Sequence, residues 1–313
     1  MEHRRIAPGR LTGPGSAGGE GRPLALVKGA GDLATGVALR LVRAGYSVVM
    51  TETAQPTVVR RKVALAEAVY EGRVEVEGLE GVLAPEEDIP GLLAQGVVPV
   101  LVDPEARVRR RLKPELLVDA IIAKRNLGTR ITDAPIVVAL GPGFVAGRDA
   151  HAVVETMRGP TLGRVLTEGS ALPDTGIPAE RHGFGKERIL RSPGDGVFAP
   201  LRQIGDRVEK GDVVGLVHGI AAAQGGGPAD GLVDGATRGA AVVSQLDGVI
   251  RGLLRGGLQV TAGFKLGDVD PGATLRDCYA VSDKALVVGG GVLQAACLLG
   301  LYSAAGRHSS AAC

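Results

Sequence analysis

The stretch that decides the fold is residues 24–52, which read LALVKGAGDLATGVALRLVRAGYSVVMTE. Residues 24–28 are a short apolar run of the kind found in buried strands. The glycine turn GAGDLA follows them directly. Residues 37–44 favour a helix that Gly45 ends, and residues 47–52 are apolar again. This segment therefore predicts one β-α-β unit.

The same alternation continues downstream. Residues 57–70 and 86–95 have helical character. Residues 73–82 fit a pair of strands, and residues 97–102 and 135–140 are apolar runs of strand type. Residues 116–126 fit either a strand or a helix. Strands that alternate with helices favour a mainly parallel sheet, so we expect a Rossmann-like α/β domain over residues 24–187.

From residue 188 the chain changes to short apolar pieces separated by glycines, and one segment repeats. Residues 196–215 align without gaps on residues 248–267. Two valines match, and the matched glycines are Gly196 with Gly248, Gly205 with Gly257, Gly211 with Gly263 and Gly215 with Gly267. The repeat predicts a pseudo-twofold all-β module over residues 188–271, a barrel-sandwich of the biotinyl/lipoyl type.

Covalent biotin or lipoate is excluded for this module. Such carriers present a lysine on the hairpin between the two halves, and no lysine occurs from Asp212 to Phe264. We therefore expect a structural or docking module. Residues 219–239 form a glycine-rich insert, which we expect to be flexible.

The two ends of the chain differ in character. Residues 1–23 are a Gly/Pro/Arg lead that we expect to be disordered, and residues 272–313 read as a C-terminal helical segment with a tail. Three consecutive glycines, 289–291, would weaken that helix unless a neighbour packs closely against them. Glycine is also the anomaly of the whole composition, with 49 of 313 residues.

Composition excludes several classes of protein. Aromatic residues make up 3% and the net charge is +2, so nothing indicates nucleic-acid binding. Cys278, Cys297 and Cys313 lack paired spacing and the histidines are scattered, so no metal site is expected. Buried structural roles are the favoured reading of Cys278 and Cys297. No apolar run suggests a membrane span or secretion signal, so we expect a cytoplasmic protein without a membrane partner.

The glycine turn is the first candidate binding site. Gly29, Gly31 and Ala34 fit the G-x-G-x-x-A fingerprint between a strand and a helix, where the backbone and the helix N-terminus can receive a phosphate. Glu52 ends the next strand, where an acidic side chain meets a ribose hydroxyl in Rossmann sites. Asp32 partly offsets this anion-binding potential and could instead N-cap the helix. The alternative is a structural turn without a ligand.

Two further segments hold candidate residues. Lys124 and Arg125 follow an apolar run, either facing a ligand crevice or ending a helix as solvated cations. A second glycine loop, residues 141–147, precedes His151 and Glu155, which share a face in a helix or a strand. These two could bind an anion or move a proton, or belong to an ordinary polar loop.

The candidates form two sets. The candidate ligand-binding residues are Gly29, Gly31, Asp32, Thr35, Gly36, Glu52, Lys124, Arg125, Asn126, Gly141, Gly143, Arg158 and Arg164. The candidate catalytic residues are Asp119, Lys124, His151 and Glu155. Whether the chain is an enzyme stays open.

Eight strings of the sequence, in order, carry a family resemblance. They are residues 27–36 (VKGAGDLATG), 49–52 (VMTE), 66–72 (AEAVYEG), 117–126 (LVDAIIAKRN), 140–144 (LGPGF), 151–156 (HAVVET), 162–164 (LGR) and 265–271 (KLGDVDP). Across residues 24–300 the chain resembles the YqeB-type accessory proteins of the selenium-dependent molybdenum hydroxylase system.

The resemblance implies a maturation role beside hydroxylases of the xanthine dehydrogenase class. Its implied ligand is the molybdenum cofactor or a nucleotide, and its implied partner is a molybdenum hydroxylase. The phosphate of such a ligand suits the glycine turn together with Lys124, Arg125, Arg158 and Arg164.

Two other hypotheses remain, along with a possible homo-oligomer. An NAD(P)-dependent oxidoreductase would use Gly29, Gly31 and Glu52, although the sequence has no Tyr-x-x-x-Lys pair as proton donor. In a pure binding module, the β domain would dock a partner and the Rossmann-like part would be a scaffold.

Overall fold

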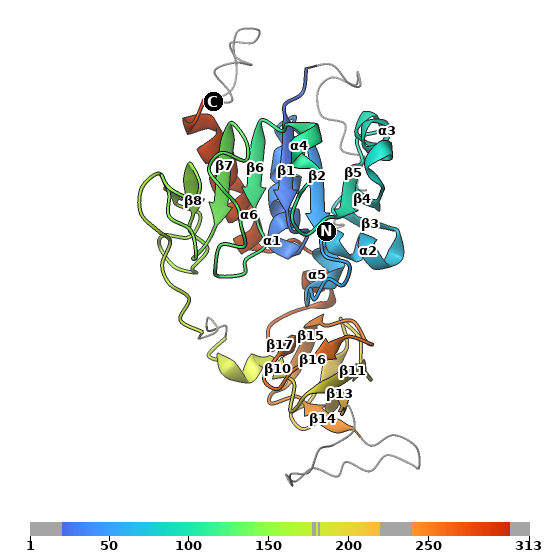
Figure 1. The fold of residues 1–313 in the computed structure, drawn as a ribbon. Coiled ribbons are helices and arrows are strands. Elements are labelled where there is room, and N and C mark those ends of the chain that lie inside the picture. Colours follow the sequence, from blue (N-terminus) through green and yellow to red (C-terminus); the bar gives the residue numbers. More distant parts are fainter. Residues whose placement is uncertain (1–20, 177–179, 181, 220–238, 301–313) are drawn as a thin grey trace, which may run out of the picture. The chain divides into compact units, whose positions relative to one another are not determined.

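The computed structural model describes residues 21–176, 180, 182–219 and 239–300 (Figure 1). The chain divides into two compact units. Unit 1 consists of Met1–Pro56, Ala64–Asp174 and Val281–Cys313, and unit 2 of Thr57–Val63 and Thr175–Ala280. Most of the predicted N-terminal lead, the glycine-rich insert and the C-terminal tail lie outside the described residues.

A nine-stranded sheet forms the centre of unit 1, in the order β3-β4-β5-β2-β1-β6-β7-β8-β9 (Figure 1). The strands from β4 to β8 in that order run parallel, and β3 and β9 pair antiparallel at the two ends. The strands are β1 (Leu24–Lys28), β2 (Ser47–Glu52), β3 (Arg73–Val76), β4 (Leu79–Leu83), β5 (Val98–Val102), β6 (Leu116–Asp119), β7 (Ile136–Leu140), β8 (Ala152–Val154) and β9 (Val165–Leu166). The mainly parallel sheet expected from the sequence is confirmed.

The helices of unit 1 are mostly short. They are α1 (Asp32–Arg43), α2 (Ala68–Glu71), α3 (Ile89–Ala94), α4 (Arg109–Leu112) and α6 (Asp283–Leu298), with 3₁₀ turns at Leu65–Glu67 and Glu86–Asp88. The long helix suggested for residues 57–70 is replaced by short turns and α2. Residues 116–126 are β6 followed by a loop, because the apolar run is long enough only for one short strand.

Both faces of the sheet are covered, which explains why its central strands are almost wholly apolar. Leu26, Val49, Leu117 and Val137 belong to one buried cluster that includes Ile89 of α3. The alternate residues of the same strands are equally buried, on the opposite face. The core therefore sits in two layers, one on each side of the sheet.

The helices α1 and α6 pack together at glycines. A Cβ atom added at Gly36 would lie 2.7 Å from the Cβ of Ala285, and one at Gly289 would lie 2.7 Å from the carbonyl oxygen of Gly36. A Cβ at Gly291 would lie 2.5 Å from the carbonyl oxygen of Gly163. Close packing thus explains Gly289 and Gly291, whereas an added Cβ at Gly290 would meet no atom within 4 Å.

Unit 2 consists of two four-stranded antiparallel sheets, β10-β17-β15-β12 and β14-β13-β11-β16. Its strands are β10 (Ile189–Arg191), β11 (Gly196–Pro200), β12 (Arg207–Val208), β13 (Val213–His218), β14 (Ala240–Val243), β15 (Gly248–Leu253), β16 (Gln259–Val260) and β17 (Lys265–Asp270). Helix α5 (Leu275–Cys278) and 3₁₀ turns at Arg61–Val63 and Lys186–Arg188 complete it.

The internal repeat is confirmed, and the two copies exchange strands. Strands β11, β12 and β13 recur as β15, β16 and β17 at the expected spacing. Strand β12 pairs with β15 of the other copy, and β16 pairs with β11. The symmetry also includes β10 and β14, which pair with β17 and β13 respectively. Neither copy can therefore complete its sheet alone.

The matched glycines of the repeat have matched backbone conformations. Gly205 and Gly257 have φ angles of +102° and +84°, and Gly211 and Gly263 have φ angles of +101° and +77°. Other residues rarely adopt this left-handed region. The glycine matches seen in the sequence therefore reflect the same two turns built twice.

One stretch, Leu275–Leu298, is long and apolar enough by length and composition to cross a membrane. It combines α5 with α6. Within unit 1, buried residues of α6, including Val288, Val292 and Ala295, belong to the protein core. Core burial accounts for the apolar character of α6, as it does for many helices of this composition.

We predict opposite stability effects for alanine at two adjacent glycines of α6. Gly289→Ala should lower the free energy of unfolding by about 1–3 kcal/mol, because the new methyl group meets the backbone of α1. Gly290→Ala should be neutral or stabilising by up to about 1 kcal/mol, since no atom lies within 4 Å of its added Cβ. Denaturant unfolding checks both, and equal effects would contradict the close packing of α1 on α6.

Candidate functional site

The carboxyl edge of the nine-stranded sheet brings three predicted loops together. The strand order reverses between β1 and β6, which is where open α/β sheets bind ligands. An added Cβ at Gly29 would lie 3.0 Å from the carbonyl oxygen of Ala120, in the loop after β6. One at Gly143, after β7, would lie 2.5 Å from the backbone of Arg125. The loop after β6 therefore contacts both the loop after β1 and the loop after β7.

A buried ion pair joins β1 to β6 beneath these loops. The Lys28 Nζ atom lies 3.4 Å from the Asp119 carboxylate, with both side chains at most 5% exposed. Lys28 donates a hydrogen bond to Thr129 Oγ1 at 2.5 Å, and that hydroxyl donates to Asp119 at 2.5 Å. Asp119, a candidate catalytic residue, is thus fully engaged in holding the sheet.

The glycine turn is organised by Glu52. The Ala30 N–H donates to Glu52 Oε2 at 2.9 Å, and the Thr53 N–H donates to Oε1 at 2.7 Å. The carboxylate that a Rossmann site would offer to a ribose is therefore already bonded to backbone. Helix α1 begins after Gly31 and no side chain caps it in the described structure.

Three other candidate residues of this segment belong to the start of α1 and its packing. Asp32 is the first residue of α1 and not its N-cap, which corrects that alternative. The Thr35 hydroxyl donates to the Gly31 carbonyl at 2.9 Å and accepts from the Leu65 N–H at 2.9 Å. Gly36 packs on α6, as described above. Thr35 and Gly36 thus shape the turn from behind.

The loop after β6 presents cations at the same edge. Lys124 and Arg125 are exposed, and Lys124 forms an ion pair with Asp174 at 2.6 Å. Asn126 accepts from the Thr129 N–H at 2.8 Å and donates to the Thr129 carbonyl at 2.8 Å. Asn126 therefore positions the residue that bridges Lys28 and Asp119.

The remaining candidates lie around β8. Gly141 has a φ of +71° and approaches Thr156. The Glu155 carboxylate is buried and accepts from the N–H groups of Met157 and Leu172. Arg158 binds Asp283 at the start of α6 through two hydrogen bonds of 2.8 and 2.9 Å, and this hydrogen bonding raises its pKa. Arg164 is exposed.

His151 and Glu155 do not form a pair. They flank β8 (Ala152–Val154), so they lie at opposite edges of the sheet, about 13 Å apart along an extended strand. The sequence predicted that the two residues share a face. Sharing a face does not bring them close together here, because the whole of β8 lies between them. His151 instead accepts a hydrogen bond from the Val137 N–H at 3.0 Å.

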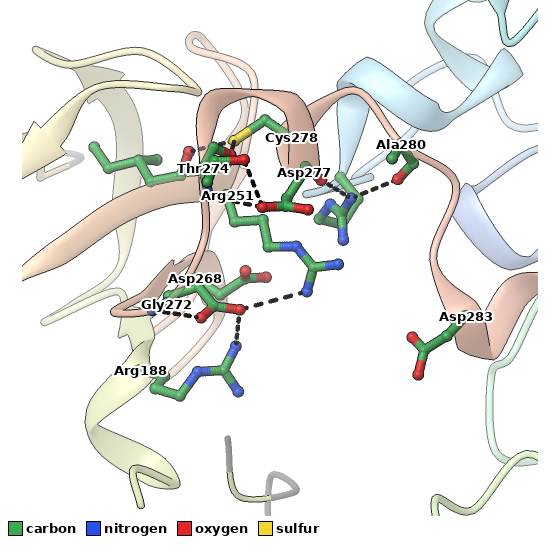
Figure 2. Close-up of polar contacts among 12 residues, drawn as sticks. Arg188, Arg251, Asp268, Gly272, Thr274, Asp277, Cys278, Ala280 and Asp283 are labelled. Carbon is green, nitrogen blue, oxygen red and sulfur yellow. Dashed lines mark hydrogen bonds and ion pairs between the residues drawn. The ribbon is translucent and has the colours of Figure 1, made fainter. Parts of the chain in front are cut away.

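Unit 2 contains a buried charge cluster that the sequence patterns did not reveal (Figure 2). The Asp270 carboxylate is 1% exposed and lies 3.6 Å from Arg188 and 3.7 Å from Arg251. The Gly272 N–H donates to its other oxygen at 3.2 Å. These residues come from separate segments of the chain. Among the strings noted in the sequence, KLGDVDP contains one member of the cluster, Asp270.

A third arginine ties the inserted segment Thr57–Val63 into unit 2. Arg60 is buried and donates to the carbonyl oxygens of Asp277 and Ala280 at 3.2 Å each. Helix α5 starts with a capping box between Thr274 and Asp277, whose hydrogen bonds lower the pKa of Asp277. These contacts join separate segments of unit 2 to one another.

The cysteines have different environments. Cys278 is buried and burial raises the pKa of its thiol, so the expected structural role is supported. Cys297 is exposed on α6, which corrects the expectation of burial. Cys313 lies outside the described residues. No group of three or more His, Cys, Asp and Glu within the described ranges is placed to hold a metal ion.

Comparison with known proteins gives one strong sequence match. The chain is 44% identical over 282 residues to the uncharacterized protein YqeB of Escherichia coli strain K12, and the alignment covers 89% of this chain. The two proteins are homologues. The alignment covers 48% of YqeB, so the chain spans about half the length of the curated relative that it matches. No family model matches the chain.

Solved structures give only distant likenesses. An aspartoacylase family protein from Mesorhizobium loti is 12% identical with a TM-score of 0.26, covering 81% of this chain and 86% of its own. The ectoine utilization protein EutE (DoeB) from Ruegeria pomeroyi is 14% identical with a TM-score of 0.24, covering 80% and 85%. Values this low assign no activity.

We predict strong energetic coupling between Lys28 and Asp119. Lys28→Met alone should lower the free energy of unfolding by about 3–5 kcal/mol, because it leaves a buried carboxylate without its cation. The double variant Lys28→Met/Asp119→Leu should recover most of that loss. Denaturant unfolding of the two single variants and the double variant checks this, and additive losses would refute the coupling.

We predict selective alkylation of the cysteines. Iodoacetamide should modify Cys297 in the native protein and leave Cys278 unmodified, because Cys278 is buried and its raised pKa keeps it as the unreactive thiol. Peptide mapping by mass spectrometry reads both sites. Unfolding in denaturant is the control and should make Cys278 reactive; equal native rates would contradict its burial.

Proposed function

We propose that this chain is a cytoplasmic accessory protein for the maturation of selenium-dependent molybdenum hydroxylases and that unit 1 binds a phosphate-bearing ligand. The contact among the loops after β1, β6 and β7 carries the proposal. It gathers the glycine turn, the cations Lys124 and Arg125 and the second glycine loop at the switch point of the sheet. Homology to YqeB supports placing the chain with the accessory proteins that its motifs resemble.

The residues at this edge suit a phosphate. The N-terminus of α1, a helix of 12 residues, has no side-chain cap, so its first N–H groups and positive dipole end can receive an anion. Arg125 is an exposed cation on the adjoining loop and can add a charge-assisted hydrogen bond. The molybdenum cofactor and nucleotides share this phosphate chemistry, and unit 2 would be the docking part for the hydroxylase.

The oxidoreductase alternative is disfavoured by Glu52. A ribose at the end of β2 would compete with the hydrogen bonds from Ala30 and Thr53 that this carboxylate already accepts. Asp119, the acidic group nearest the turn on β6, is held by Lys28 and Thr129. Hydride transfer also needs a proton donor, and Lys124, the candidate catalytic lysine at this edge, is paired with Asp174.

Gly31→Asp tests the ligand site at a position whose backbone conformation suits other residues. Gly31 has a φ of −65° and a ψ of −175°, a conformation that aspartate adopts readily. Its carboxylate would cap α1 and repel a phosphate, so we expect binding of ADP, the probe, to fall at least about tenfold in calorimetry. The free energy of unfolding should stay equal or rise by a few tenths of a kcal/mol.

The controls separate the hypotheses. Arg125→Gln should weaken ADP binding, whereas Arg130→Gln, an exposed arginine in the same loop, should not. Wild-type protein that binds neither ADP nor a co-purifying ligand detectable by mass spectrometry would overturn the ligand site. Full hydroxylase activation in cells carrying Gly31→Asp would overturn its role in maturation, and hydride transfer from NADH would support the oxidoreductase instead.

A further inference from the structure

A hollow of about 750 Å³ lies at the amino edge of the nine-stranded sheet, opposite the proposed phosphate site. Pro114, Pro135 and His151, which line it, stand just before β6, β7 and β8. Because neighbouring parallel strands begin at the same edge, these residues are brought side by side. The hollow belongs wholly to unit 1, and its size is that of a small-molecule site.

The charge balance of the hollow is positive. Arg109 donates to Asp133 at 3.0 Å, and Asp133 also accepts from the Arg130 N–H, so this carboxylate is occupied. Arg110 and Lys113 also line the hollow, and both are exposed. Neither side chain makes a hydrogen bond or ion pair with any residue in the described part of the chain.

His151 adds one hydrogen-bond donor, the Nε2–H group of its neutral ring. Its Nδ1 accepts from the Val137 N–H at 3.0 Å, so the neutral ring carries its proton on Nε2. Burial lowers the pKa of His151, which favours this neutral form near neutral pH. The Nε2–H group is then a donor on a ring that the strand itself orients.

The rest of the lining is mostly apolar. Pro114, Ile131, Ala134 and Pro135 provide an uncharged apolar wall, and Thr132 adds one hydroxyl group. We infer that this hollow binds a small organic anion with an apolar body, its anionic group bound by Arg110, Lys113 and His151 and its body against this wall. This site is separate from the proposed phosphate site and does not depend on it.

Fluorine NMR with the full-length protein tests the inference. The probes are para-fluorobenzoate, its neutral isostere para-fluorobenzamide, and inorganic phosphate as a competitor that has charge but no apolar body. We expect fluorine NMR to show that the benzoate binds and that the benzamide binds at least about tenfold more weakly. In proton–carbon NMR of the same protein, the benzoate should shift the His151 ring signals. Phosphate should displace the benzoate poorly.

The matched variants lie on and beside the same short helix. Arg110→Gln/Lys113→Gln should reduce benzoate affinity at least about tenfold. Arg111→Gln removes one positive charge from a residue that pairs with Glu86 and does not line the hollow, so affinity should not change. No benzoate binding, binding unaltered in the double variant, or binding without a His151 shift would each overturn the inference. Equal binding of the benzamide or of phosphate would overturn the stated ligand class.

Discussion

The buried contact between Lys28 and Asp119 is the constraint on which unit 1 depends. It joins β1 to β6, the two strands between which the sheet reverses its order. A lysine and an aspartate at the ends of buried strands would each be costly alone, and together with Thr129 they satisfy one another. Their pairing therefore fixes the register of the two halves of the sheet and the start of both loops above it.

The same contact determines where the glycine turn can lie. Gly29 follows Lys28 and Ala120 follows Asp119, so the ion pair places the Gly29 backbone against the Ala120 carbonyl. A side chain at position 29 would collide there, and its φ of +90° also favours glycine. One glycine of the fingerprint is thus explained by the protein's own packing. Gly31, the N-cap of α1, is the glycine of the fingerprint to which the proposed ligand site assigns a role.

Local patterns predicted the elements well. The strands at 24–28 and 47–52, the helix between them and the repeat of unit 2 follow from runs and spacings that a short segment contains. Long-range packing was beyond these patterns. The expected close neighbour of the glycine run is confirmed for Gly289 and Gly291, but only the fold shows that these neighbours are Gly36 and Gly163. The Arg188–Asp270–Arg251 cluster unites residues too distant in sequence to form a motif.

Residue spacing could not predict which side chains lie close together where the type of element, helix or strand, was undecided. His151 and Glu155 are adjacent in a helix but far apart in a strand, and β8 lies between them.

The two edges of the sheet differ in the source of their positive potential. At the carboxyl edge, positive potential comes partly from backbone N–H groups at the start of α1, which are fixed in place and oriented by the fold. At the amino edge no long helix begins, so positive potential must come from side chains such as Arg110 and Lys113, which are flexible and screened by salt. If both proposals hold, the first edge would select a ligand by the geometry of its phosphate, and the second mainly by its charge and apolar surface.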